Sequence, residues 1–145
     1  LKSMLSVGHR IPKKNILISS GPTRSKVELL NSTRMLIEKG YNIYSTAGTA
    51  KFFKENGIDT QILYWPDEDK EPNIMEYLHD RRIDLVINIP KNHTKRELDN
   101  GYKIRRAAVD YNIPLITNAR LASAFIYAIC KVDPSEIAIK SWDEY

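Results

Sequence analysis

Cysteine and histidine are scarce in this chain of 145 residues, which has one cysteine, Cys130, and three histidines. A lone cysteine cannot close an internal disulfide, and its place in the apolar run 121–132 favours a buried structural thiol in a reducing compartment. The histidines are too scattered for the spacing of a metal site or of a nucleophile triad. We therefore expect no metal and no cofactor in this chain.

Long apolar runs are missing as well, because no stretch approaches the ~20 residues that a transmembrane helix needs. Residues 1–14 lack the apolar core and cleavage site of a signal peptide. A hydrophobic content of 42% and a charged content of 28% are ordinary for a globular protein. The sequence predicts a domain with no membrane partner, in the cytoplasm, and leaves the mitochondrial matrix open.

Neither sign of charge forms a block, although the formal net charge is +4. The densest basic cluster, residues 91–106, is interrupted by Glu97 and Asp99. A nucleic-acid-binding surface would have a longer basic run with interleaved aromatic residues. We therefore expect no nucleic-acid partner, and the cluster fits a small anionic ligand or a protein surface better.

Short apolar runs alternate with segments of helical periodicity, which predicts five β/α units. The expected strands are residues 15–20, 41–46, 59–64, 84–89 and 114–117, and the expected helices are residues 25–39, 49–56, 73–82, 102–111 and 119–131. Residues 91–100 are polar and are predicted to form a loop, and a weak edge strand is predicted over residues 137–140. Residues 1–14 resemble the end of a linker from a preceding domain, which leaves residues 15–145 as one domain.

Strands joined by such helices pair in parallel through right-handed crossovers. We therefore predict an α/β fold, a doubly wound, five-stranded parallel sheet with helices on both faces. In such sheets ligands bind beyond the carboxyl ends of the strands. The expected strands end at Thr46, Trp65 and Asn88, so these residues are candidates for a binding site.

Residues 41–50, Tyr-Asn-Ile-Tyr-Ser-Thr-Ala-Gly-Thr-Ala, lead from a strand into a helix through hydroxyl residues and Gly48. Hydroxyls and the positive end of a helix dipole bind anions, although an ordinary N-cap and tight turn explain the same residues equally well. We predict that Lys26, Thr46 and Thr49 hold a carboxylate or phosphate, with the rest of the ligand against Trp65 and Asn88.

Motifs in residues 46–50, 84–88, 104–110 and 113–118 together resemble the C-terminal regulatory domain of the carbamoyl phosphate synthetase large chain, which has the methylglyoxal-synthase-like fold. The resemblance covers roughly residues 15–131. It implies an allosteric effector at the strand ends, controlling carbamoyl phosphate synthesis for the arginine and pyrimidine pathways. It also implies the remainder of the large chain, an ATP-dependent ligase, and a small glutaminase subunit as partners.

The resemblance leaves two effector classes open. In nucleotide-regulated members it implies a phosphate held by Lys26 and by the two threonines, but Trp65 stands where those members have a second lysine and Pro90 where they have a threonine. The acetylglutamate-activated urea-cycle synthetase is more similar, although Lys91 replaces an asparagine of its site. It implies ligand contacts at Thr46, Thr49, Trp65, Asn88 and Asn100. We favour an acetylglutamate-like effector over a nucleotide monophosphate.

A methylglyoxal-synthase-type lyase acting on dihydroxyacetone phosphate is the alternative function. That chemistry needs a carboxylate base and a nearby histidine. Glu71 is the nearest counterpart of the carboxylate, Glu97 stands at the position of the histidine, and His93 is predicted to face solvent. We therefore expect no catalytic residue in this domain. A third interpretation is a docking module, and whether Arg105 and Arg106 contact effector or partner stays open.

Overall fold

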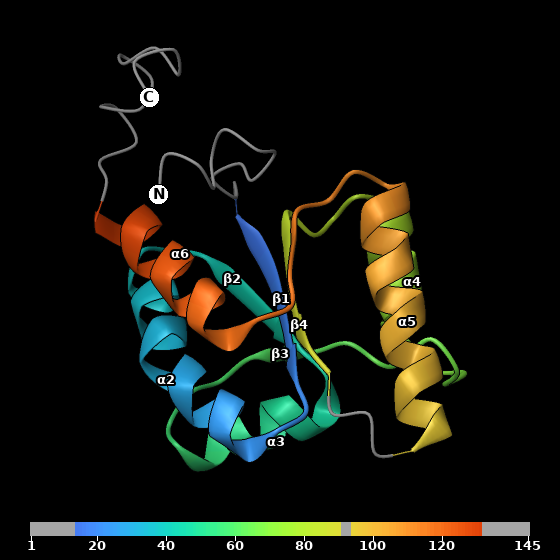
Figure 1. The fold of residues 1–145 in the computed structure, drawn as a ribbon, viewed down its shortest axis with the longest axis horizontal. Coiled ribbons are helices and arrows are strands. Elements are labelled where there is room, and N and C mark those ends of the chain that lie inside the picture. Colours follow the sequence, from blue (N-terminus) through green and yellow to red (C-terminus); the bar gives the residue numbers. More distant parts are fainter. Residues whose placement is uncertain (1–13, 91–93, 132–145) are drawn as a thin grey trace.

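The computed structural model describes residues 14–90 and 94–131, which form an all-parallel sheet between two layers of helices (Figure 1). The strands are β1 (Asn15–Ser20), β2 (Asn42–Ser45), β3 (Gln61–Ile62), β4 (Leu85–Ile89) and β5 (Leu115–Ile116), in the order β3-β2-β1-β4-β5. The helices are α2 (Thr23–Glu38), α3 (Ala47–Glu55), α4 (Ile74–His79), α5 (Lys95–Asp110) and α6 (Ala119–Lys131). The predicted doubly wound, five-stranded parallel fold is confirmed.

The side chains of successive strand residues alternate between two hydrophobic cores, one on each face of the sheet. Ile16 and Ile18 of β1 pack with α2, α3 and α6, whereas Leu17 between them packs with α4 and α5. All five residues of β4 are buried, as expected of a central parallel strand. Cys130 of α6 is 7% exposed and lies in the first core, which confirms the predicted buried thiol.

Helix α5 begins at Lys95, so the prediction of a loop as far as Asn100 was wrong. Thr94 is its N-cap: the Thr94 hydroxyl accepts a 3.1 Å hydrogen bond from the Glu97 backbone N–H and donates another of 3.1 Å to the Glu97 carboxylate. The polar residues of this segment are the exposed side of the first helical turns. Apolar periodicity, on which the prediction relied, is weak there.

The edge strand β3 is shorter than the predicted strand over residues 59–64, because only its middle pairs with β2. At its carboxyl end, Tyr64 makes an isolated bridge with Asn73 instead. The predicted strand over residues 137–140, the linker up to residue 13, Lys91 and His93 lie outside the described residues.

From β1 the chain first adds β2 and β3 toward one edge of the sheet, and it then returns to add β4 and β5 toward the other edge. The direction of strand addition therefore reverses between β1 and β4. Beyond the carboxyl ends of two such neighbours the connections diverge and leave a crevice, which is where doubly wound sheets bind ligands. The fold therefore directs attention to the ends of β1 and β4.

Candidate functional site

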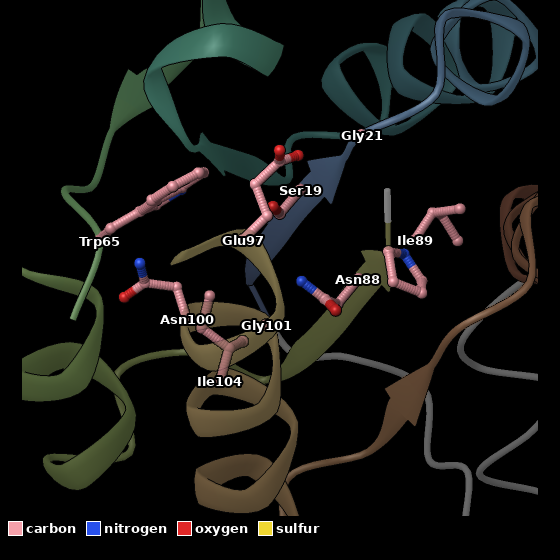
Figure 2. A pocket seen from close by; sticks show the side chains of 10 residues that line it. Ser19, Gly21, Trp65, Asn88, Ile89, Glu97, Asn100, Gly101 and Ile104 are labelled. Atoms are coloured by element: carbon pink, nitrogen blue, oxygen red, sulfur yellow. The ribbon is translucent and has the colours of Figure 1, made fainter. Parts of the chain in front are cut away.

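A pocket with a volume of about 50 Å³ lies at the carboxyl ends of β1 and β4, between these strands and the first turns of α5 (Figure 2). We call it the rim pocket. It is lined by Ser19, Gly21, Trp65, Asn88, Ile89, Pro90, Glu97, Asn100, Gly101 and Ile104. Three of the predicted site residues, Trp65, Asn88 and Asn100, therefore come together from a loop, a strand and a helix.

Asn88 forms the floor of the rim pocket. It pairs in register with Ser19 of β1, and the side chains of both residues lie on the face of the sheet that α5 covers. Asn88 is 4% exposed, and its Oδ1 accepts a 2.8 Å hydrogen bond from Arg105 Nη1. Figure 2 shows its amide nitrogen directed toward Trp65 and Glu97, so that Asn88 presents a donor to the pocket.

Arg105 reaches Asn88 because Gly101 leaves room for its guanidinium group. A Cβ atom at Gly101 would lie 2.9 Å from Arg105 Nη1. The sequence left the role of Arg105 open, and its bond to Asn88 spans 17 positions of the chain. In the sequence, the only indication of the contact between Arg105 and Asn88 is Gly101, one helical turn before Arg105. A single glycine cannot specify which residue the arginine contacts.

Thr46 and Thr49 join the ends of β1 and β2 to the start of α3. The Thr46 hydroxyl lies 3.2 Å from Ser19 Oγ and 3.3 Å from Thr49 Oγ1. Thr49 is 2% exposed, and its Oγ1 accepts a hydrogen bond from the Ser20 backbone N–H and donates one to the Ser20 carbonyl oxygen. Thr46 therefore borders the rim pocket through Ser19, whereas Thr49 is occupied with the backbone of β1.

The indole of Trp65 forms one wall of the rim pocket, with Arg96 against it. The guanidinium carbon of Arg96 lies 4.9 Å from the centre of the Trp65 ring. Arg96 also holds the Asp67 carboxylate through two hydrogen bonds of 2.6 and 3.1 Å. The hydrogen bond from Arg96 lowers the pKa of Asp67 below its ordinary value, since it favours the charged carboxylate. We call the pair Arg96 and Asp67 the clamp, because it ties the Trp65 loop to α5.

Asn100 is 2% exposed and links the same two segments. Its Oδ1 accepts a 3.1 Å hydrogen bond from the Asp67 backbone N–H, and its Nδ2 donates a 3.0 Å hydrogen bond to the Arg96 carbonyl oxygen. Both polar atoms of the Asn100 amide thus have partners within the protein. The geometry gives Asn100 a part in positioning the Trp65 loop, in addition to its place in the pocket lining.

The remaining candidates lie outside the centre of the pocket. Lys26 of α2 is not among the lining residues, and its ammonium nitrogen lies 5.9 Å from the centre of the Phe52 ring. Glu71 is exposed and does not line the pocket, whereas Glu97 lines it with its carboxylate bonded to Thr94. Among the described residues, no group of three or more His, Cys, Asp or Glu side chains could hold a metal ion. No helix in the same part of the chain is long and apolar enough to cross a membrane.

Comparison with known proteins places this chain in a family. The family described as "MGS-like domain" matches residues 28–117. The chain is 44% identical to multifunctional protein ura1 of Schizosaccharomyces pombe over 138 residues, which are 90% of this chain and 6% of that protein. It is 38% identical to the carbamoyl phosphate synthase large chain, C-terminal section, of Aquifex aeolicus, over 88% of this chain and 23% of that protein.

Two further similarities extend the comparison. The mitochondrial carbamoyl-phosphate synthase [ammonia] of Homo sapiens is 38% identical over 90% of this chain and 9% of its own length. Among solved structures, methylglyoxal synthase from Elizabethkingia anophelis superposes with a TM-score of 0.56 at 17% identity, covering 80% of this chain and 79% of that one. At this identity the superposition shows the shared fold alone. The chain spans a small part of the curated relatives named here.

Proposed function

Because this chain belongs to the family of MGS-like domains, we propose that it is the effector-binding regulatory domain of a carbamoyl phosphate synthase large chain. The observation that carries the proposal is the rim pocket at the reversal of strand order, with the Asn88 amide held in place by Arg105. A buried amide whose oxygen already has a partner offers its N–H₂ group to an acceptor on a ligand. In this proposal the pocket binds an effector and does no chemistry.

The ligand chemistry follows from the groups around the pocket. Asn88 supplies an amide donor, Ser19 supplies a hydroxyl beside Thr46, and Trp65 supplies an apolar wall. The Glu97 carboxylate also lines the pocket and no described lining residue is a cation, so these groups suit a single carboxylate on a short organic body better than a more highly charged ligand. We therefore favour an amino-acid derivative such as acetylglutamate over a nucleotide monophosphate.

The size of the rim pocket supports the same choice. A cavity of about 50 Å³ is small beside the ~300–1,000 Å³ of most small-molecule sites, so a ligand has to displace the Trp65 loop to enter. The clamp and the Asn100 amide are what hold that loop, and a small ligand needs less displacement than a nucleotide. Movement of this loop and of α5 is a route from the effector to the rest of the enzyme.

The partners in this proposal are the remainder of the synthetase large chain and its small glutaminase subunit, with control of carbamoyl phosphate synthesis for the arginine and pyrimidine pathways. The similarity of this chain to a small part of much longer proteins, one of them called a carbamoyl phosphate synthase large chain, supports the assignment. ATP binding belongs to the rest of that chain, and the proposed location is the cytoplasm.

The lyase alternative has less support from the geometry. Glu71, the nearest counterpart of the catalytic carboxylate, lies outside the pocket lining. The Glu97 carboxylate accepts a hydrogen bond from the hydroxyl of Thr94, the N-cap of α5. A general base has to lie within hydrogen-bond reach of the proton that it removes. The regulatory function needs no such group, so the same residues are compatible with it.

Calorimetric titration of the wild-type chain with acetylglutamate and with uridine monophosphate tests the proposal. We expect the wild type to bind acetylglutamate more tightly, and Trp65→Lys to bind the nucleotide more tightly than the wild type does, because it adds a cation at the pocket wall. Tyr127→Lys, on an exposed aromatic residue of α6, is the matched control and should change neither affinity. Wild-type binding of the nucleotide at least about tenfold tighter would refute the choice of effector. Binding of neither compound would count against the regulatory function.

A further inference from the structure

A second hollow, with a volume of about 290 Å³, lies between α3 and the edge strand β3. It is lined by Ala47, Ala50, Lys51, Lys54, Asp59, Thr60 and Ile62, none of which lines the rim pocket. We call it the α3/β3 hollow. It is larger than the rim pocket and approaches the lower end of the size range of small-molecule sites.

The hollow exists because small side chains of α3 face the end of a short edge strand. Ala47 and Ala50 are about one helical turn apart and leave space that longer side chains would fill. Ile62 pairs with Ser45 in register, so its side chain lies on the α3 face of the sheet, and it is 40% exposed there. The hollow therefore has an apolar floor with an accessible aliphatic side chain.

Two cations lie beside this floor. Lys51 and Lys54 are three positions apart on α3, which places them on the same side of the helix. Within residues 14–90 and 94–131, no carboxylate lies within 4.0 Å of either ammonium group. Thr60 lines the hollow as well, with its hydroxyl oxygen buried and not exposed to it.

From these groups we propose that the α3/β3 hollow is a binding site for a compact organic dicarboxylate. Its carboxylates pair with Lys51 and Lys54, and its methylene chain packs on Ala50 and Ile62. Asp59, also in the lining, opposes ligands with further negative charge, such as nucleotide phosphates. The site is separate from the rim pocket but shares α3 with Thr49, so its occupation acts on the same helix.

Nuclear magnetic resonance of the 145-residue chain, titrated with glutarate, tests the proposal. Glutarate carries two carboxylates on a short apolar chain and is the probe throughout. We expect saturable shifts at the amides of Ala50, Lys54 and Ile62, with a dissociation constant on the order of 1 mM. The double variant Lys51→Gln/Lys54→Gln should weaken binding at least about tenfold, because both carboxylates lose their cations.

Two control variants distinguish binding in the α3/β3 hollow from a general effect of surface charge or of the substitutions themselves. Lys39→Gln, at the carboxyl end of α2, removes one surface cation elsewhere and should leave the affinity unchanged. Thr60→Val keeps the shape of the lining and should also leave the affinity unchanged, because the hydroxyl oxygen of Thr60 is buried away from the hollow. The proposal is overturned if the shifts fall on Ser19, Asn88 and Gly101, if no saturable shift appears, or if Lys39→Gln weakens binding as much as the double variant. These results do not depend on whether acetylglutamate binds the rim pocket.

Discussion

At the scale of single residues, the hydroxyl of Thr49 shows how a residue expected to bind a ligand also holds the protein together. Thr49 Oγ1 bonds both the N–H and the carbonyl oxygen of Ser20, and these groups are buried at the end of β1. Loss of such a hydroxyl leaves a backbone donor in the interior without a partner. The site residue is therefore a structural link between β1 and α3.

We predict that Thr49→Ala lowers the free energy of unfolding by about 1–3 kcal/mol, because the Ser20 backbone N–H loses its buried acceptor. Thr49→Ser keeps the hydroxyl and should retain most of the stability. Urea denaturation of the 145-residue chain measures both changes, with the exposed Thr23→Ala as the control, expected within about 0.5 kcal/mol of wild type. A fully stable Thr49→Ala variant would show that Thr49 is free to serve the ligand alone.

At the scale of elements, the first turns of α5 organise the rim pocket. They carry Arg96, whose guanidinium both contacts the Trp65 ring and binds Asp67, and Asn100, whose amide bridges the same loop. The next residue, Gly101, makes room for the Arg105 side chain to reach Asn88. A single helix thus positions the wall and the floor of the pocket, and its N-cap, Thr94, sets where these turns begin.

The clamp predicts a pH dependence of stability. Because Arg96 lowers the pKa of Asp67 in the folded chain below the ordinary 3.8, the carboxylate stabilises the folded state above that value. The contribution is lost as the pH falls through the lower, folded pKa. We therefore expect Asp67→Asn to destabilise the chain at neutral pH and to approach the stability of wild type in acid.

Denaturation of wild type and Asp67→Asn across this pH range measures the difference. Asp69→Asn changes another exposed aspartate of the same loop and is the matched control. A difference that stays constant into acid, or that is no larger than the difference seen for Asp69→Asn, would contradict a stabilising role for the clamp.

At the scale of the whole molecule, the fold separates the rim pocket from the α3/β3 hollow. Helices α3 and α5 lie on opposite faces of the sheet (Figure 1). The rim pocket lies beside α5 and the hollow beside α3, yet Thr46 stands at the N-terminus of α3 and its hydroxyl contacts Ser19 of the rim pocket. Two ligands that contact the same helix can change each other's affinity, and such an effect is reciprocal. The fold is shared with a lyase, so activity has to be tested directly.

We expect the 145-residue chain to release no phosphate from dihydroxyacetone phosphate above the rate in buffer. The physical reason is that Glu71 is outside the pocket lining, and that Glu97, whose carboxylate lines the pocket and accepts a hydrogen bond from the Thr94 hydroxyl, has no histidine beside it among the described lining residues. A coupled phosphate assay decides the question. Turnover clearly above buffer that disappears in Glu71→Gln would establish the lyase and overturn the regulatory proposal.

The sequence by itself determined the features that depend on local periodicity. The buried run in β4, the alternation of strands and helices and the burial of Cys130 were all predicted, because strand and helix patterns repeat within a few residues. The start of α5 was missed where polar residues hide that periodicity. Trp65 and Asn88, which the predicted strand ends indicated, line one pocket, and Asn100, which the resemblance alone implied, lines it from α5.

Only the tertiary structure decided how these residues are used. The bond from Arg105 to Asn88 and the bridge of Asn100 to the Trp65 loop join separate segments of the chain, and the hollow beside Lys51 and Lys54 depends on how α3 packs against β3. Such contacts depend on the order of the strands and on the angle at which each helix crosses the sheet. No pattern within one segment encodes those quantities, because they result from packing all segments into one core.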